Sequence, residues 1–232
     1  VIASPTHMHL AHLERAVDRK KPALVEKPIS NATDPSYAEE IVQRARAPIM
    51  VGTMLRFHSC VKKARKWLDG GLIGRPLWAS FTCAQFNDKY TDDVILNWGA
   101  HELDLARYLL GPCEVVGCVG GRGLADIVMV HEKNGCHTTV HLDYLTKPEY
   151  RGFNIIGTKA RLACDLVTRK AWVIGADKVH YGSDSFDENY IDEMQAFISL
   201  IDGKPAPHAA TGADGLAVLE LCLEAKRMAG IQ

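Results

Sequence analysis

Two patterns of hydrophobic and polar positions alternate along the first quarter of the chain. Short apolar runs predict three strands, at 1–3, 23–25 and 48–54. Apolar residues spaced three and four apart predict two helices between them, at 9–19 and from about 33 to 46. Pro22 ends the first helix and Pro35 lies in the first turn of the second. Short strands separated by helices indicate βαβ units and a buried parallel sheet.

Beyond residue 56 the pattern changes to strands in succession. Helical spacing returns in four stretches, at 58–68, 97–110, 187–202 and 212–229. Alternating or short apolar runs predict seven strands, at 77–86, 113–119, 125–132, 136–145, 151–157, 159–166 and 169–175. Asn134-Gly135 between two of them favours a hairpin, since such turns need positive φ. This order is typical of an α+β domain with a large, open, mostly antiparallel sheet. We therefore expect two domains, at residues 1–55 and 56–232.

Composition narrows the possible partners. The 232 residues are 47% apolar and 24% charged, with a net charge of −1, and no Lys/Arg block occurs. Neither nucleic acid nor a membrane surface is therefore an expected partner. No apolar run approaches the roughly 20 residues that span a bilayer. The seven cysteines form no C-x-x-C pair, which favours free thiols in a reducing cytoplasm over a disulfide framework.

Polar side chains gather in four stretches. Three follow the predicted parallel strands: Ser4-Pro5-Thr6-His7-Met8-His9, Val25-Glu26-Lys27-Pro28 and Met54-Leu55-Arg56-Phe57-His58. Open α/β sheets bind ligands at such strand ends. The fourth opens a helix: Asn97-Trp98-Gly99-Ala100-His101-Glu102-Leu103-Asp104. A lysine and a histidine that meet at a cleft suit the oxidation of a hydroxyl group, which needs a hydride acceptor and a base.

In this order and spacing the four stretches resemble the Gfo/Idh/MocA family of NAD(P)-dependent sugar and cyclitol oxidoreductases. The strongest single motif is Glu-Lys-Pro after a strand. It is accompanied by T-x-x-H, L-R-F-H and G-x-H-x-x-D-L-x-R-Y-L-L-G. The resemblance covers essentially the whole chain. It implies the C-terminal half of a Rossmann-type parallel sheet, followed by an α+β substrate and oligomerisation domain that assembles homo-oligomers through its sheet.

The resemblance also implies roles for individual residues. Lys27 would lie beside the substrate hydroxyl and the nicotinamide of NAD or NADP, with a cis bond to Pro28. His101 would be the general acid/base, because an imidazole exchanges protons near neutral pH. The cofactor would contact Ser4, Pro5, Thr6, His9, Glu26, Lys27 and Arg56. The substrate would contact Lys27, Asn97, His101 and Arg56, and no metal is required.

Two features depart from the family pattern. Asn97 stands where many members carry Asp; asparagine accepts hydrogen bonds but does not raise the pKa of His101 as a carboxylate would. No G-x-G-x-x-G occurs, so the loop that cradles the pyrophosphate and the residue that discriminates NAD from NADP would precede Val1. Residues 1–3 would then be the fourth strand of a domain that lacks its first half, with an exposed edge that favours association.

Three interpretations stay open. The chain is a sugar or cyclitol oxidoreductase, or a truncated part of one. Alternatively, it is a non-catalytic sugar-binding or oligomerisation module that has lost dinucleotide binding. In the third interpretation, another chain supplies the missing strands. The sequence leaves the particular sugar and the direction of reaction undefined.

Overall fold

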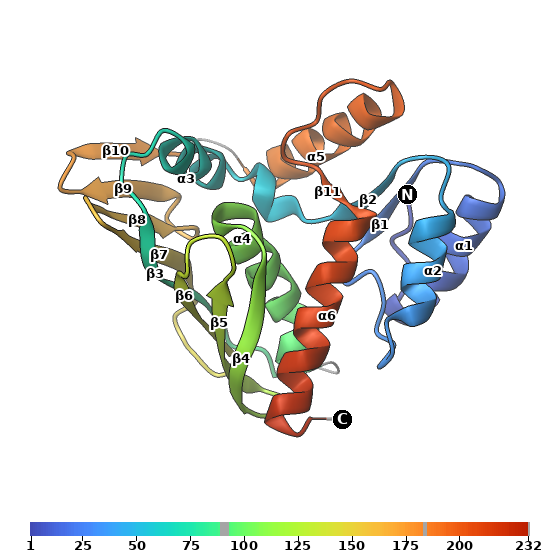
Figure 1. Ribbon diagram of the computed structural model, residues 1–232, viewed down its shortest axis with the longest axis horizontal. Coiled ribbons are helices and arrows are strands. Elements are labelled where there is room, and N and C mark those ends of the chain that lie inside the picture. The colour runs from blue at the N-terminus through green and yellow to red at the C-terminus, as the bar shows by residue number, and fades with distance from the viewer. Residues whose placement is uncertain (89–92, 183–184, 232) are drawn as a thin grey trace.

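The computed structural model describes residues 1–88, 93–182 and 185–231, and two sheets organise them (Figure 1). The smaller sheet has the order β1-β2-β11. Its strands are β1 (Ala23–Glu26), β2 (Ile49–Gly52) and β11 (Ala210–Thr211). β1 and β2 are parallel, as predicted, and β11 joins β2 antiparallel from the far end of the chain. The strand predicted at 1–3 is reduced to one parallel bridge between Ile2 and Val25.

Helices cover both faces of the smaller sheet. They are η1 (Thr6–Met8), α1 (His9–Asp18), α2 (Ser36–Arg44), η2 (Met54–Phe57), α5 (Phe186–Ile201) and α6 (Gly212–Ala229). Val25 and Val51 share a buried cluster with α1, α2 and α6. Leu24 and Met50, which alternate with them, pack against Phe197 of α5. This alternation explains the continuous apolar runs of the parallel strands, because both faces are buried.

Helix α6 links the two sheets. Its first turn is a capping box, in which Thr211 and Asp214 satisfy each other's backbone N–H groups. A Cβ atom at Gly215 would lie 2.5 Å from Val51 Cγ2, so glycine lets the helix approach β2 closely. Further along, α6 packs on the larger sheet at β4. The chain end therefore belongs to the smaller sheet as well, and residues 1–55 do not form that unit alone.

The larger sheet has the order β10-β9-β8-β7-β3-β6-β5-β4. Its strands are β3 (Pro76–Ala84), β4 (Cys113–Gly120), β5 (Leu124–His131), β6 (His137–Asp143), β7 (Tyr150–Gly157), β8 (Arg161–Asp165), β9 (Lys170–Ile174) and β10 (Lys178–Tyr181). Only β3 and β6 pair in parallel; the other neighbours are antiparallel. The predicted large, mostly antiparallel sheet is confirmed, with β10 as an additional edge strand.

One face of the larger sheet carries helices and the other is open (Figure 1). The covering helices are α3 (Ser59–Asp69), α4 (Ala100–Leu110) with the preceding π-helical segment η3 (Ile95–Gly99), and α6. Phe81, Val140 and Phe153 are fully buried beneath them, whereas Trp78 and Ile156 on the opposite side are exposed. No helix in the described ranges is long and apolar enough to cross a membrane.

Candidate active site

Lys27 reaches from the end of β1 to the start of the segment before α4. Its Nζ donates hydrogen bonds to the backbone oxygen of Asn97 at 2.7 Å and to Asn97 Oδ1 at 3.1 Å. The peptide bond to Pro28 is cis, as expected. The structure therefore joins the two sequence motifs, which lie 70 residues apart, through the ammonium group of Lys27.

A tyrosine that the sequence did not single out orients Asn97. Asn97 Nδ2 donates to Tyr144 Oη at 2.9 Å, so the amide oxygen faces Lys27. The Tyr144 ring lies edge-on against Trp98, with ring centroids 4.5 Å apart. A Cβ atom at Gly99 would lie 2.9 Å from Leu142 Cδ1, so glycine brings this segment onto β6. Trp98 thus packs against the sheet beside the site.

Both titratable groups of the predicted pair have depressed pKa values. Burial and then the charge of Arg151 lower the pKa of Lys27 to about 8, although the nearby Glu26 opposes the shift. Burial, Lys27 and Arg151 lower the pKa of His101 well below its usual range. The imidazole is therefore neutral at neutral pH, and its buried Nδ1 has no hydrogen-bond partner among the described residues. A neutral imidazole beside an ammonium is a proton acceptor.

An ion pair behind this site was not predicted. Arg151, in β7, places Nε and Nη2 at 2.7 and 2.6 Å from the same atom, Glu102 Oε1. Glu102 follows His101 in α4 and its side chain is completely buried. Burial raises the pKa of Glu102, and Arg151 opposes that shift. The sequence signal was a charged residue within the apolar face of a helix, and its partner lies 49 positions away.

His9 holds the first loop of the chain against the cis-proline segment. Its ring is buried; Nδ1 lies 2.9 Å from the carbonyl oxygen of Pro28 and Nε2 lies 2.9 Å from that of Ser4. Ser4 Oγ lies 3.1 Å from His12 Nδ1. Both nitrogens of His9 therefore contact carbonyl oxygens of the protein itself.

The loop continues to the side of Lys27. Pro5 precedes η1 as its N-cap residue. A small cavity of about 60 Å³ opens beside the loop and is lined by Thr6, Lys27, Pro28, Asn31, Leu96 and Asn97. Thr6 and Lys27 are thus brought to one opening, as predicted from their positions at strand ends.

Glu26 lies across the end of the neighbouring strand. A Cβ atom at Gly52 would be 2.9 Å from Glu26 Oε2, so the carboxyl group rests directly on this glycine. Burial, and then the proximity of Glu26, raise the pKa of Glu193 in α5 to about 8. Oε1 of Glu193 and Oγ1 of Thr53 are buried and lack partners in the described ranges. These buried, unpartnered oxygens make the strand ends polar.

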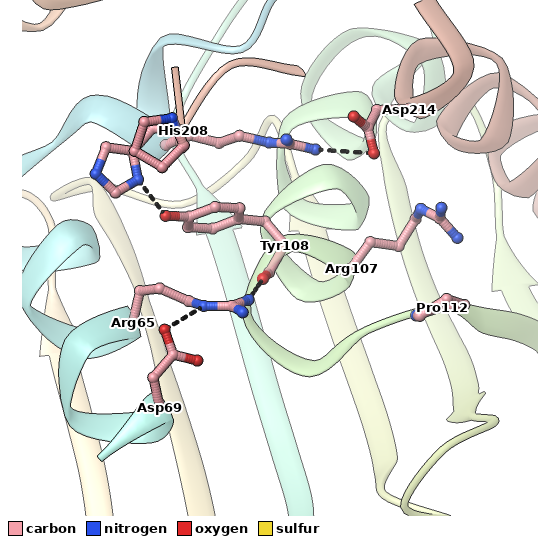
Figure 2. A pocket seen from close by; sticks show the side chains of 9 residues that line it. Arg65, Asp69, Arg107, Tyr108, Pro112, His208 and Asp214 are labelled. Atoms are coloured by element: carbon pink, nitrogen blue, oxygen red, sulfur yellow. Dashed lines mark hydrogen bonds and ion pairs between the residues drawn. The ribbon is translucent and has the colours of Figure 1, made fainter. Parts of the chain in front are cut away.

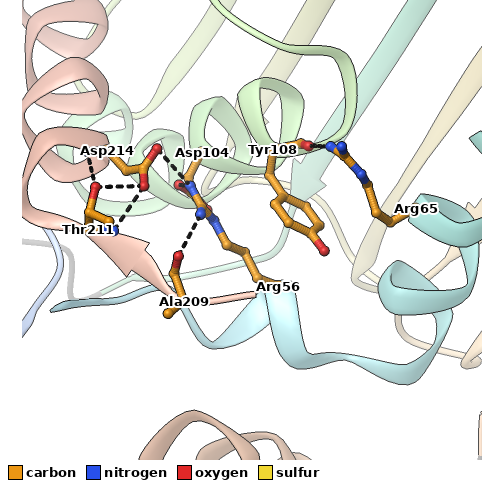
Figure 3. Close-up of polar contacts among 7 residues, drawn as sticks. All are labelled: Arg56, Arg65, Asp104, Tyr108, Ala209, Thr211 and Asp214. Carbon is orange, nitrogen blue, oxygen red and sulfur yellow. Dashed lines mark hydrogen bonds and ion pairs between the residues drawn. The ribbon is translucent and has the colours of Figure 1, made fainter. Parts of the chain in front are cut away.

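Arg56 is not brought to Lys27. It forms a two-pronged ion pair with Asp104, with Nε–Oδ2 at 2.9 Å and Nη2–Oδ1 at 2.6 Å (Figure 3). Nη1 donates to the carbonyl oxygen of Ala209 at 3.4 Å, and Asp214 lies 3.7 Å from Nη2. The guanidinium therefore fixes α4 to the segment before α6. The proposed contact of Arg56 with cofactor or substrate has no support in this position.

A cavity also lies on this side of α4. It has a volume of about 430 Å³, and its wall includes Arg56, Arg65, Tyr108 and His208 (Figure 2). Tyr108 Oη lies 2.6 Å from His208 Nδ1, and Arg65 donates to the carbonyl oxygen of Tyr108. Lys27 and His101 do not line it.

Comparisons with known proteins agree with the geometry. A profile of the GFO/IDH/MocA C-terminal domain matches residues 61–163. The inositol 2-dehydrogenase of Mycolicibacterium gilvum is 28% identical over 96% of this chain and 70% of its own length. The D-apiose dehydrogenase of Rhizobium rhizogenes is 27% identical over 63% of this chain and 47% of its own length.

Solved structures share the fold. An oxidoreductase from Agrobacterium radiobacter, solved with NAD⁺, L-tartaric acid and magnesium, superposes with a TM-score of 0.87 at 23% identity, over 99% of this chain and 77% of the other. An inositol dehydrogenase homologue from Azotobacter vinelandii, solved with NADH and myo-inositol, gives 0.80 at 16% identity, over 97% and 74%. The chain thus shares the fold of these structures. Within it, residues 61–163 match the GFO/IDH/MocA C-terminal domain.

Proposed function

We propose that this chain carries the reaction centre of an NAD(P)-linked oxidoreductase that acts on a CH–OH group of a sugar, sugar derivative or cyclitol. The observation that carries this proposal is the placement of Lys27, held by Asn97 and with a pKa of about 8, close enough to the neutral His101 to lower its pKa. Functional groups whose pKa values are moved by burial and neighbouring charges are typical of acid/base sites. The dehydrogenases among its relatives support the same reaction class.

The residues at the strand ends fit the nicotinamide end of a dinucleotide. Thr6, Lys27 and Pro28 line one opening, and the unpartnered Thr53 Oγ1 and Glu193 Oε1 offer polar contacts nearby. These side chains would hold the nicotinamide and its ribose. The sequence carries no G-x-G-x-x-G loop for the pyrophosphate. When bound, the cofactor supplies the hydride acceptor for oxidation.

The chain's own residues handle the proton. Oxidation of the alcohol moves one hydride from carbon to the cofactor and one proton from oxygen to a base. Neutral His101 accepts that proton. The ammonium of Lys27 donates a hydrogen bond to the same oxygen and stabilises its developing negative charge. Asn97 holds Nζ in place through two acceptor oxygens, so little reorganisation is required.

The first test is fluorescence titration of the chain with NADH and with NADPH, followed by turnover of a panel of sugars and cyclitols. Lys27→Met should lower turnover by about 10²- to 10⁴-fold, the range of acid/base contributions. Lys21→Met, at an exposed lysine, is the matched control and should leave turnover unchanged. Saturable binding with turnover that survives Lys27→Met would reject the assignment of the reaction centre.

Absence of saturable binding of either nucleotide would favour the second function, a non-catalytic sugar-binding or oligomerisation module. A specific observation supports assembly through the open face of the larger sheet. Trp78 pairs with Ile156 in register, and Ile174 lies on the same side two strands further; all three are exposed. Light scattering should find a homo-oligomer that Ile156→Lys dissociates. A monodisperse wild-type monomer would reject this interface.

Because all seven cysteines are free, we place the protein in the cytoplasm.

A further inference from the structure

A second cavity lies next to the Lys27 site. Its volume is about 350 Å³, within the range of small-molecule sites, and its wall includes His58, Cys83, Gln85, Glu149, Tyr150 and Arg151. Cys83 and Arg151 are paired in register on β3 and β7. Both also act on the pKa of Lys27, so this part of the wall lies close to the ammonium group. A substrate whose hydroxyl meets Lys27 would therefore have its other end near Arg151.

The guanidinium of Arg151 is incompletely used by the protein. Its Nε and Nη2 both face one oxygen of Glu102, and its side chain keeps 22% of its surface exposed. Although Nη2 lies near Glu102 Oε1, it makes no hydrogen bond to any described residue, and neither does the second oxygen of Glu102. Guanidinium carries five N–H donors in a planar fork. Arg151 thus has donors left at the wall of a cavity.

Two cationic side chains lie at or near the cavity. Lys27 and Arg151 are both cationic, and the buried partner of Arg151 is the single carboxyl of Glu102. Burial raises the pKa of that carboxyl, Arg151 opposes the shift, and Glu26 is the carboxyl group that acts on Lys27. Asn97, at the position that contacts Lys27, is neutral. The other acidic group at the wall, Glu149, is exposed to solvent, where its charge is screened.

We propose that the substrate is a polyhydroxylated acid whose carboxylate binds Arg151, while a hydroxyl group meets Lys27 and His101. The placement of the hydroxyl rests on the proposed function. The carboxylate site itself rests on the cavity and on the unused donors of Arg151. Arginine suits this role because its fork matches the geometry of a carboxylate.

The competing explanation is that Arg151 serves only as the buried partner of Glu102. The two explanations differ in what Glu102→Gln does. A purely structural arginine loses its function together with its partner. An arginine that binds ligand becomes freer to do so, and the binding of an anion is retained or strengthened.

The test is cofactor-free titration of the 232-residue chain with two matched pairs of probes: D-glucuronate against D-glucose and D-galacturonate against D-galactose. Each pair differs only in a carboxylate that replaces a CH₂OH group. Calorimetry and saturation-transfer NMR measure the affinities. A charge-assisted hydrogen bond predicts that at least one uronate binds about 10- to 100-fold more tightly than its hexose.

Four variants test whether Arg151 causes the preference for uronates over hexoses. Arg151→Met should abolish it, and the double variant Glu102→Gln/Arg151→Met should do the same without leaving a buried, unpaired carboxyl group. Glu102→Gln should preserve or increase it. Arg161→Met removes the same charge from an exposed arginine of the same sheet, held by Asn154, and should leave the preference intact.

Equal affinity for uronate and hexose in the wild type, or a uronate preference that survives in the folded double variant, would overturn the proposal. Loss of the preference in Arg161→Met as much as in the double variant would overturn it too, since net charge alone would then explain binding. Because no nucleotide is present, failure here is distinct from failure of the oxidoreductase assignment. Selective uronate binding without NAD(P)-linked turnover would reject only the latter.

Discussion

Glu193 gives a sharp test of the electrostatics at the strand ends. This carboxyl group of α5 is 3% exposed, and Glu26 lies near it. Its pKa is raised from 4.5 to about 8 because burial and the neighbouring carboxyl disfavour the charged form, whereas the N–H of Thr53 partly stabilises it. Glu193→Gln keeps the shape and removes the ionisation.

The magnitude follows from proton linkage. The folded protein keeps the proton of Glu193 between pH 4.5 and about 8, whereas the unfolded chain releases it. Wild-type stability is therefore fully retained below pH 4.5 and is lost relative to the Gln variant as the pH rises toward 8. Each pKa unit corresponds to about 1.4 kcal/mol, so the relative loss by pH 7 is at most about 3 kcal/mol.

The assay is urea unfolding of wild type and Glu193→Gln at half-unit steps from pH 5 to 8. We expect the variant to gain stability over the wild type steadily with pH, by about 1–3 kcal/mol across this range. Asp187→Asn, at an exposed carboxyl of the same helix, is the matched control. A pH-independent difference for Glu193→Gln would refute the buried-carboxyl reasoning.

Two further substitutions test neighbouring parts of the structure. Asn97→Asp places a carboxylate against Lys27 Nζ and should raise the pKa of Lys27 from about 8 by about 1–3 units. The pKa is measured by NMR titration of the lysine ε-methylene group. An unchanged pKa would mean that the contact does not form in solution. Arg56→Met leaves Asp104 buried without a partner and should lower the free energy of unfolding in urea by about 3–5 kcal/mol. Arg227→Met, at an exposed arginine, is the control and should lower it by under about 1 kcal/mol. Equal losses would contradict the buried ion pair.

Local sequence patterns were sufficient for most elements of the fold. Apolar periodicity located α1, α3, α5 and α6 and the strands from β3 to β9, because each buries one face or stripe. It missed β11, since Ala210–Thr211 becomes a strand only by pairing with β2. It also placed Asn97 on a regular helix with His101, whereas the structure has a π-helical turn at Ile95–Gly99. Pairing partners and irregular turns depend on tertiary contacts that a local window does not contain.

The candidate site was predictable only in part, for a related reason. The resemblance singled out Lys27 and His101, and the structure brings their two motifs together. The pairing of Arg56 with Asp104, and of Arg151 with Glu102, joins residues 48 and 49 positions apart. In the sequence, an arginine beside a strand end is equally consistent with a ligand contact and with one half of an ion pair. Only the position of the acidic partner decides between the two.

The neutral side chain at position 97 and the incompletely used Arg151 belong to one electrostatic arrangement. An aspartate at 97 would pair with Lys27 and offset its positive charge near Arg151. Asparagine gives Lys27 the same two acceptor oxygens without that offset. The departure from the family pattern thus keeps the pKa of Lys27 low and leaves a positive charge for an anionic substrate. Asn97→Asp should therefore weaken the preference for uronates while Arg151 stays in place, and an undiminished preference would separate the two features.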